Sequence, residues 1–239
     1  MATRILCTRP LYLQVRDTLA ERIAMGIWKP GTPLPNEGDL ARECGVSAGT
    51  MRKALDILES ERLVTRRQGR GTFVNDQASG EFAIRYTNIR GSTGERITGK
   101  VQAVEVSEGK ADAQERARLR LKEQDAVYRV RCVRLEDDQP FMVEETSMPA
   151  AIFPGLLENS GFLNHIAILA QQHGVLLGKA EERISIDLAT SAVAKALRVD
   201  PSSPILVLDR VLRTLDGSPI EWRVGRCHLS THHYSTEIG

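Results

Sequence analysis

The stretch from Leu34 to Val74 restricts the fold of this 239-residue chain more than any other part of the sequence. Asn36 stands just before two acidic residues, which is the pattern of a helix N-cap followed by a first turn that favours negative charge. Gly45 interrupts that helix, and Ser47 supplies a second N-cap. Apolar residues then recur at spacings of three and four, which predicts one buried helix face made of Met51, Ala54, Leu55 and Leu58.

A short, basic hairpin is predicted directly after these two helices. Residues 63–67 and 72–74 are β-prone runs, and they flank the sequence Gln68-Gly69-Arg70-Gly71. The two glycines permit positive φ and close backbone approach, while Arg70 can reach a phosphate or the minor groove. Helix, tight turn, helix and basic hairpin in this order are the layout of a winged helix-turn-helix, whose second helix enters the DNA major groove.

An amphipathic helix precedes this block, and a difference in charge sets the whole region apart from the rest of the chain. Apolar residues recur every four positions, at Leu11, Val15, Leu19 and Ile23. Residues 1–75 hold 12 Lys/Arg and 8 Asp/Glu, a net charge of +4, whereas the remaining residues hold 20 and 23, a net charge of −3. We therefore expect residues 1–75 to form a DNA-binding domain.

The expected DNA contacts lie at the N-terminal end of the second of these two helices and at the hairpin tip, because a recognition helix points that end at base edges. Small, hydroxyl-bearing and cationic residues gather there, and such residues can approach bases and phosphates. The candidates are Ser47, Gly49, Thr50, Arg52, Lys53, Arg66, Gly69, Arg70 and Gly71. Two alternatives stay open: the arginines form an ordinary solvated face, or the domain binds protein instead of DNA.

Residues 76–96 are rich in Ser, Gly, Thr and Asn and poor in large aliphatic residues, so we expect a linker with a loop. Within it, Gly91-Ser92-Thr93-Gly94 is a candidate backbone nest for an anion, although such a segment is more often a plain loop. The remaining residues, 97–239, are expected to form a second domain.

The second domain shows an internal repeat. Residues 101–106, 126–135 and 141–145 favour strands, and residues 111–120 and 163–172 favour helices. The helix-and-hairpin pattern returns in the second half of the domain at a constant offset, which aligns Pro140 with Pro219 and Arg131 with Arg210. Such a repeat predicts a pseudo-symmetric antiparallel sheet with flanking helices and a pocket between its halves.

Residues 1–75 resemble the DNA-binding domain of the GntR family of bacterial transcription regulators. The resemblance is carried by Pro10-Leu11-Tyr12, Leu34-Pro35-x-Glu37, Val46-Ser47, Thr50-x-Arg52 and Gly69-Arg70-Gly71-Thr72-Phe73-Val74. The family usually has a basic or bulky residue at 38, Arg at 48 and Gly at 62, where this chain has Gly38, Ala48 and Arg62. The resemblance therefore implies DNA binding with two side-chain contacts missing, where one good base contact is worth about 1–3 kcal/mol.

Residues 97–239 resemble the UTRA effector-binding domain of the HutC-type GntR subfamily, which shares the chorismate lyase fold. The matching segments are Asp137-x-x-Pro140, Phe153-Pro154-Gly155-Leu156 and Asp216-Gly217-x-Pro219-x-Glu221, together with Arg134 and Glu144. The resemblance implies an α+β chain, in which an N-terminal winged helix-turn-helix is joined to an antiparallel-sheet domain for ligand binding and dimerisation.

The same resemblance places Arg134, Glu144 and Glu221 in an effector pocket. The other arginine of the family's pair falls on Cys132, which argues against a phosphosugar, because a phosphate favours a second cation. Arg131 and Arg223 are the candidates to replace that cation, and Asn164 falls near the position of a polar ligand contact. The alternative for these charged residues is a set of cross-strand ion pairs.

Together these features predict a cytoplasmic, homodimeric, ligand-responsive transcription regulator and favour a repressor. Its expected partners are a double-stranded, pseudo-palindromic DNA operator and a small anionic metabolite, without a membrane segment, cofactor, metal site or catalytic residue. The four cysteines show no Cys-x-x-Cys spacing, so reduced structural thiols are expected. A lyase-like enzyme and a protein-interaction module are the competing classes.

Overall fold

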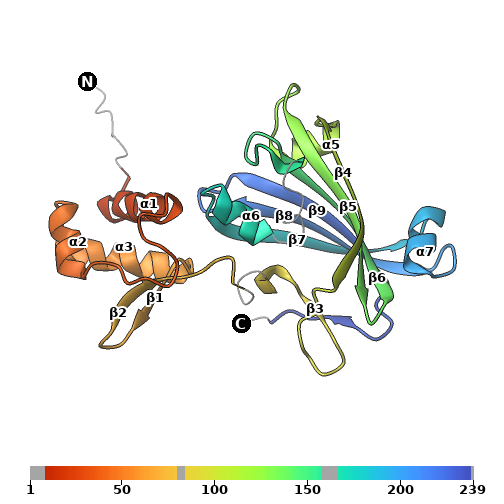
Figure 1. Ribbon diagram of the computed structural model, residues 1–239, viewed down its shortest axis with the longest axis horizontal. Helices are drawn as coiled ribbons and strands as arrows, with labels where there is room; N and C mark the ends of the chain where they lie inside the picture. Colours follow the sequence, from red (N-terminus) through yellow and green to blue (C-terminus); the bar gives the residue numbers. More distant parts are fainter. Residues whose placement is uncertain (1–8, 80–83, 158–165, 238–239) are drawn as a thin grey trace, which may run out of the picture. The chain divides into compact units, whose positions relative to one another are not determined.

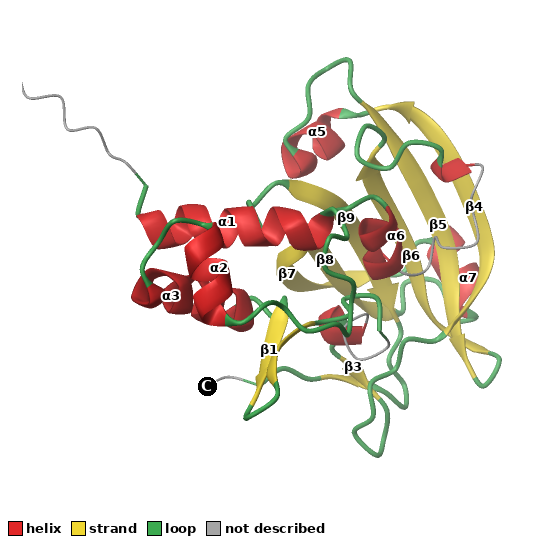
Figure 2. Cartoon of the chain, turned by 60° about the vertical axis from the view of Figure 1, so that its left-hand side comes forward, coloured by secondary structure: helices red, strands yellow, loops and turns green. Residues whose placement is uncertain are grey.

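The computed structural model describes residues 9–79, 84–157 and 166–237. These residues divide into two compact units: the first runs up to Ser79 and includes the short segment Gly174–Leu176, and the second holds the rest. Figures 1 and 2 show that the first unit is mainly helical and that the second is built on a large sheet. No helix among the described residues is long and apolar enough to span a membrane.

The first unit is a winged helix-turn-helix, as the sequence predicts. It contains helices α1 (Leu11–Ala24), α2 (Glu37–Glu43) and α3 (Ala48–Ser60), followed by the antiparallel strands β1 (Val64–Arg67) and β2 (Gly71–Val74). Both expected N-caps form, because the Asp39 N–H donates to the Asn36 side chain over 2.9 Å and the Thr50 N–H donates to Ser47 Oγ over 3.2 Å. The predicted apolar face of α3 is buried in the core of the unit, with Leu19 and Leu40.

Helix α3 ends on a residue that adopts a left-handed backbone conformation without being glycine. Arg62 has φ of +58° and follows the C-cap Glu61. Its N–H donates to the Glu59 carbonyl over 2.9 Å, and the next N–H, of Leu63, donates to the Leu58 carbonyl over 2.9 Å. These two bonds form a Schellman motif, in which glycine is the usual left-handed residue.

The second unit is built on an antiparallel sheet with the strand order β4-β5-β6-β9-β8-β7. The two hairpins of the repeat lie side by side through pairing of β6 with β9, so the sheet has the pseudo-symmetry that the repeat predicts. The strands are β4 (Lys100–Lys110), β5 (Ala126–Glu136), β6 (Gln139–Pro149), β7 (Leu177–Leu188), β8 (Pro204–Thr214) and β9 (Pro219–Cys227).

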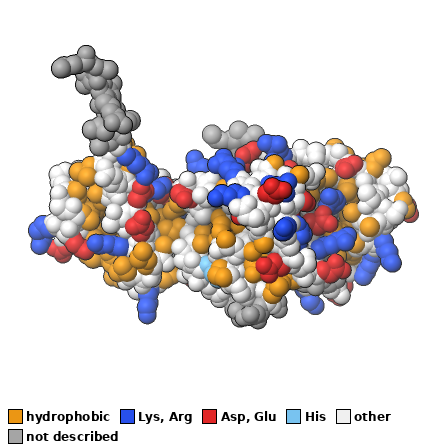
Figure 3. Space-filling model, turned by 90° about the horizontal axis from the view of Figure 1, so that it is seen from above, with side chains coloured by type: hydrophobic (Ala, Val, Ile, Leu, Met, Phe, Trp, Pro, Cys, Tyr) orange, Lys and Arg blue, Asp and Glu red, His pale blue; other side chains and the backbone are white. Residues whose placement is uncertain are grey.

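Each face of this sheet has its own cover. Helices α5 (Ala113–Leu119) and α7 (Ser191–Leu197) pack on one face, where an apolar cluster includes Val143, Val193, Leu197 and Ile205. On the other face lie α6 (Ile166–Gln172), the 3-10 turn η1 (Ile84–Tyr86) and the paired short strands β3 (Ile89–Arg90) and β10 (His233–Tyr234). On the side of this unit visible in Figure 3, basic and acidic side chains are interspersed.

Part of the segment expected to form a linker with a loop, from Ile84 to Arg96, lies in the second unit. Ile89 and Ile97 are buried in a core cluster with Phe141, and β3 pairs with β10 near the other end of the chain. The composition of the segment is loop-like, but a few well-placed isoleucines and one long-range strand pairing fold it onto the sheet.

The glycine-rich loop in this segment holds a carboxylate of the chain itself. The Thr93 hydroxyl donates to Glu95, and a side chain at Gly91 would overlap the Glu95 carboxylate. The hydrogen bond from Thr93 lowers the pKa of Glu95, as expected for an ionised carboxylate in that position. The candidate anion nest is thus occupied by Glu95.

Candidate functional site

The N-terminal end of α3 is exposed and carries most of the residues predicted to contact DNA. Ser47, Gly49 and Arg52 are exposed there, and Thr50 is half-buried. The Ser47 and Thr50 side-chain oxygens lie 3.0 Å apart, so the two hydroxyls are fixed beside the free N–H groups of the helix. The end of a helix that presents free N–H groups attracts phosphate oxygens.

Arg52 is oriented by an ion pair and stays open to solvent. Its Nε donates to Glu37 Oε2 over 3.3 Å, which ties α3 to α2. About two thirds of its side chain, 67%, is exposed. Because only one nitrogen is used, the two terminal nitrogens are available for a base edge or a phosphate.

Lys53 and Arg66 make contacts within the unit that the sequence spacing does not reveal. The Arg66 guanidinium bonds Asp56 and Glu59, and its backbone N–H donates to Glu59 over 2.9 Å. Burial alone would lower the pKa of Arg66, but its carboxylate partners raise it overall. The Lys53 ammonium lies 4.1 Å from the centre of the Tyr12 ring, a cation–π contact with α1. Both cations therefore brace the unit, which reduces their availability to DNA.

The hairpin tip has the predicted geometry, and the two departures from the family pattern leave an open surface. Gly69 and Gly71 have φ of +68° and +104°, values that side-chain-bearing residues rarely adopt, and Arg70 between them is exposed. Gly38 and Ala48 are also exposed, so no long side chain projects from either position. Arg52 and Arg70 are exposed at this surface; Lys53 and Arg67 are exposed as well, but each lies over an aromatic ring.

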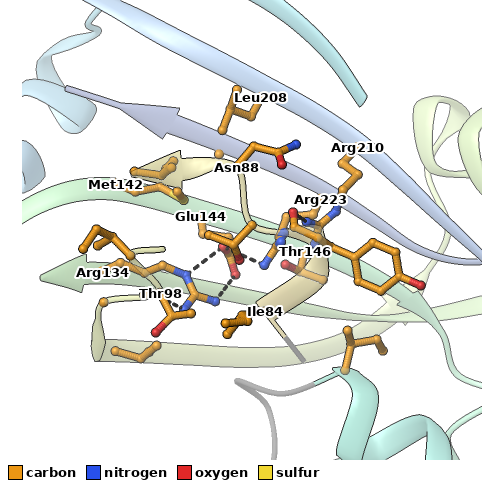
Figure 4. A pocket seen from close by; sticks show the side chains of 18 of the residues that line it. Ile84, Asn88, Thr98, Arg134, Met142, Glu144, Thr146, Leu208, Arg210 and Arg223 are labelled. Atoms are coloured by element: carbon orange, nitrogen blue, oxygen red, sulfur yellow. Dashed lines mark hydrogen bonds and ion pairs between the residues drawn. The ribbon is translucent and has the colours of Figure 1, made fainter. Parts of the chain in front are cut away.

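The second unit contains a cavity of about 280 Å³ between the sheet and the segments that cover it. Its size is near the lower end for a small-molecule site, for which pockets of roughly 300–1,000 Å³ are typical. Figure 4 shows charged side chains from β5, β6, β8 and β9 projecting into it. The lining comprises Ile84, Tyr86, Thr87, Asn88, Ile89, Ile97, Thr98, Gly99, Lys100, Val101, Arg134, Met142, Glu144, Thr146, Ile166, Ala167, Glu182, Leu208, Arg210, Glu221, Arg223 and Gly225.

Arg134 and Glu144 form a two-bond ion pair at one side of the cavity. Arg134 Nε and Nη2 donate to the two Glu144 oxygens over 2.9 and 3.0 Å, and Nη1 donates to the Thr98 carbonyl over 2.9 Å. Burial alone would lower the pKa of Arg134, but Glu144 raises it overall. Such a pair is rigid, and removing one partner would leave a buried charge.

A second ion pair crosses from β8 to β9, and Arg223 links it to the first. Arg210 Nη2 donates to Glu221 Oε1 over 3.1 Å, and Nη1 donates to the Tyr86 carbonyl over 2.7 Å. Arg223 Nη1 donates to Glu144 over 3.1 Å, while its Nε lies 3.9 Å from Glu221. Burial raises the pKa of Glu221, although Arg210 acts in the opposite direction. The result is a continuous network of alternating charges.

Arg131, which the sequence offered as a replacement cation, does not reach this cavity. Neighbouring residues of a strand point to opposite faces of the sheet, and Arg134 takes the cavity face. Arg131 is exposed on the opposite face, where its Nε lies 3.7 Å from Glu145.

Arg210, which the sequence pattern does not single out, supplies the additional cation. In register, Cys132 lies opposite Glu144 in the first hairpin, whereas Arg210 lies opposite Arg223 in the second. The separation from Arg210 to Arg223 along the chain is one residue longer than the separation from Cys132 to Glu144. The repeat alignment equates Glu144 with Arg223 and therefore places Arg210 on Arg131 instead of on Cys132. A shift of one residue in the alignment moves a strand side chain to the other face of the sheet. Counting alternate strand residues outward from each hairpin turn, without the repeat alignment, would have placed Arg210 on the cavity face.

The other predictions for the second unit concern Arg223, Asn164, the cysteines and metal binding. Arg223 lines the cavity as expected, and Asn164 lies outside the described residues. Cys132 and Cys227 are buried free thiols, and burial raises the pKa of Cys132 to about 12. Among the described residues, His, Cys, Asp and Glu side chains form no group that could hold a metal ion.

Comparisons with known proteins match both units. Residues 11–74 match the model for "Bacterial regulatory proteins, gntR family", and residues 95–233 match the UTRA domain. The mannosyl-D-glycerate transport/metabolism system repressor MngR of Escherichia coli is 31% identical over 221 residues, which cover 90% of each chain. The histidine utilization repressor of Pseudomonas aeruginosa is 28% identical, covering 94% of this chain and 89% of its own.

Solved structures share the fold. PhnF from Mycobacterium smegmatis aligns with a TM-score of 0.55 at 24% identity, covering 94% of this chain and 99% of its own. The ligand-binding domain of a GntR-family regulator from Bordetella bronchiseptica aligns with a TM-score of 0.59 at 22% identity, over 65% and 98%. The matched families and relatives are regulators of transcription, so the lyase alternative has no support. The chain belongs to the GntR family of bacterial transcription regulators and carries a UTRA domain.

Proposed function

We propose that the protein is a repressor that binds an operator through α3 and the β1–β2 tip and is released when a small molecule enters the cavity of the second unit. The observation that carries this proposal is the coexistence of an exposed, oriented arginine, Arg52, on the recognition helix and a separate cavity lined by paired charges. Relatives named as repressors support the direction of regulation. A repressor of this kind would act in the cytoplasm.

The residues divide by role. Residues 1–75 bind DNA, chiefly through Ser47, Gly49, Thr50, Arg52 and the Gly69-Arg70-Gly71 tip. Residues 97–239 bind the effector and a second copy of the chain, and part of the 76–96 segment closes the cavity. An effector that prefers one conformer would weaken operator binding by a coupling of about 1–3 kcal/mol. The effector carries an anionic group, which the cavity arginines would bind.

The outer strand β7 is the proposed dimer contact. Ile184, Ile186 and Leu188 alternate on one face of this edge strand and are 48%, 77% and 58% exposed. An exposed apolar edge strand invites pairing with another strand, and a two-fold axis would bring the same strip of a second copy against it. A dimer also presents two heads to a pseudo-palindromic operator.

DNA binding is tested by fluorescence anisotropy with fragments of the promoter region of the protein's own gene. The logarithm of the affinity should fall linearly with the logarithm of salt concentration, with a slope of about −0.9 per phosphate neutralised. Arg52→Ala should weaken binding at least about ten-fold, the range for one lost base contact. The matched control is Arg62→Ala, which removes an exposed arginine from the opposite end of α3. An equal loss in both variants would mean that α3 does not read DNA.

The dimer contact is tested by sedimentation. Ile186→Lys places a charge in the apolar strip and should shift the protein toward monomer, whereas Ser185→Lys adds the same charge to the other face of β7 and should not. A dimer that is unchanged by Ile186→Lys would exclude β7 as the interface.

A further inference from the structure

We infer that the effector is a small amino acid-like zwitterion, with its ammonium group at Glu182 and its carboxylate at Arg210 and Arg223. This inference rests on the proposed effector role of the cavity and adds the chemical class of the ligand. It differs from the expectation of a simple anion, because it assigns a separate place to a positive charge.

The charges of the cavity are close to balanced. Three arginines and three glutamates line it, and the exposed Lys100 adds one further cation. Arg134 is committed to Glu144 and Arg210 is bound to Glu221, while Arg223 bonds Glu144 and approaches Glu221. Two glutamates therefore neutralise most of the charge of three arginines. A phosphate dianion would favour several uncommitted cations, whereas one carboxylate requires fewer.

Glu182 is the lining carboxylate whose hydrogen bonds come from neutral groups of the described chain. It accepts hydrogen bonds from the Tyr234 hydroxyl over 2.6 Å and from the Asn88 amide over 3.4 Å. No Lys, Arg or His side chain of the described chain forms an ion pair with it. Burial and the hydrogen bond to Glu182 raise the pKa of Tyr234 to about 12, so the phenol stays a donor. A half-buried carboxylate with neutral partners is a favourable site for a cation.

Arg210 provides the complementary group for an anion. Its side chain is 4% exposed, and its buried Nε has no hydrogen-bond partner among the described residues. Buried N–H groups are nearly always satisfied, so an acceptor atom is expected at this position when the site is filled. Figure 4 shows Arg210 and Arg223 converging on one side of the cavity. A carboxylate placed there would accept from Arg210 Nε and from Arg223.

The strand register sets the distance between the two ligand charges. Glu182 on β7 lies directly opposite Arg210 on β8, and both residues line the cavity. Neighbouring strands are about 4.8 Å apart, so the ammonium and carboxylate groups must be close together in the ligand. This spacing suits the head group of an amino acid. Ile84, Met142 and Leu208 in the lining leave apolar surface for a short side chain.

The test is isothermal titration calorimetry on the full-length protein with the twenty common L-amino acids, supplemented by matched analogues of each one that binds. The analogues are the amine without the carboxylate and the acid without the amine. We expect at least one amino acid to bind and both of its analogues to bind at least ten-fold more weakly. Absence of binding by every amino acid, or equal binding of the acid lacking the amine, would overturn the inference, as would tighter binding of inorganic phosphate or a sugar phosphate.

A pair of variants locates the ammonium group. Glu182→Gln keeps the shape of the side chain and should weaken the amino acid at least ten-fold while sparing the acid that lacks the amine. Glu181→Gln, an exposed position on the other face of β7, is the matched control and should bind as the wild type does. Equal loss of both ligands in Glu182→Gln would contradict the assignment.

Operator binding by the unliganded protein is measured separately, by anisotropy. A protein that binds DNA but no amino acid would refute only the zwitterion, and one that binds an amino acid but no DNA would refute only the proposed repressor function. The two failures are therefore distinguishable.

Discussion

Replacing Arg62 by glycine should stabilise the first unit, although it removes a charged side chain from a helix end. Arg62 ends α3 with φ of +58°, and its side chain is exposed. The two backbone bonds of the Schellman motif and the 2.9 Å bond from the Asn75 amide to the Arg62 carbonyl involve main-chain atoms of residue 62, so glycine retains them. The substitution therefore changes mainly the cost of the backbone conformation.

The magnitude follows from two opposing terms. A left-handed conformation costs a residue with a Cβ atom about 1–2 kcal/mol. Glycine avoids that cost, but it makes the unfolded chain more flexible, which lowers stability by about 0.5–1 kcal/mol. The net gain in the free energy of unfolding is therefore about 0.5–1 kcal/mol, which lowers the unfolded-to-folded ratio roughly two- to five-fold.

Urea unfolding followed by tryptophan fluorescence can measure this gain. The chain has two tryptophans, Trp28 in the first unit and Trp222 in the second, so a Trp222→Phe background makes the signal report on the first unit. Arg62→Ala is the matched control, because it removes the same guanidinium but keeps the Cβ atom and should bring little gain. If Arg62→Gly were no more stable than Arg62→Ala, the left-handed conformation would not carry the cost assigned to it.

Three further changes test the second unit by thermal or urea denaturation. Gly99→Ala should destabilise it by about 1–3 kcal/mol, because the new Cβ would lie 2.6 Å from the Phe141 ring at a φ of +69°; an unchanged midpoint would contradict this contact. Arg134→Met should cost about 1–3 kcal/mol, because it removes two hydrogen bonds from the buried Glu144 and leaves Arg223 as the remaining partner, and an unchanged stability would mean that the ion pair is not formed. Burial alone would raise the pKa of Glu115, but hydrogen bonds, the largest from Arg129, lower it overall from 4.5. Its stabilisation is therefore full above that value and is lost as pH falls through the lower folded pKa, so Glu115→Gln should differ most from wild type near pH 7 and least once the pH lies below the folded pKa of Glu115.

The cavity also explains how the protein can lack the family's arginine at position 132 and still hold a charge network. Arg210 and Arg223 come from the second hairpin and approach Glu221 and Glu144 across the middle of the sheet. The cationic groups are thus redistributed from one hairpin to the other. This redistribution is one of the observations behind our proposal of a ligand with charges of both signs.

The sequence alone determined the head of the molecule, because the interactions that build it are local. The side chains of Asn36 and Ser47 each accept a hydrogen bond from the backbone N–H three residues ahead, and the tip glycines adopt positive φ in a tight turn. Strand positions in the two hairpins followed from alternation, for the same reason.

Only the tertiary structure decided the composition of the cavity. Glu182 meets Arg210 through the pairing of β7 with β8, and no local interaction sets the register of these two strands. Lys53 and Arg66 were assigned to DNA from their charge, and their contacts with Tyr12 and Asp56 became visible only once the helices were packed. A positive charge identifies a residue that can bind an anion. Whether that residue is still available to do so depends on its contacts with neighbours that are distant in sequence.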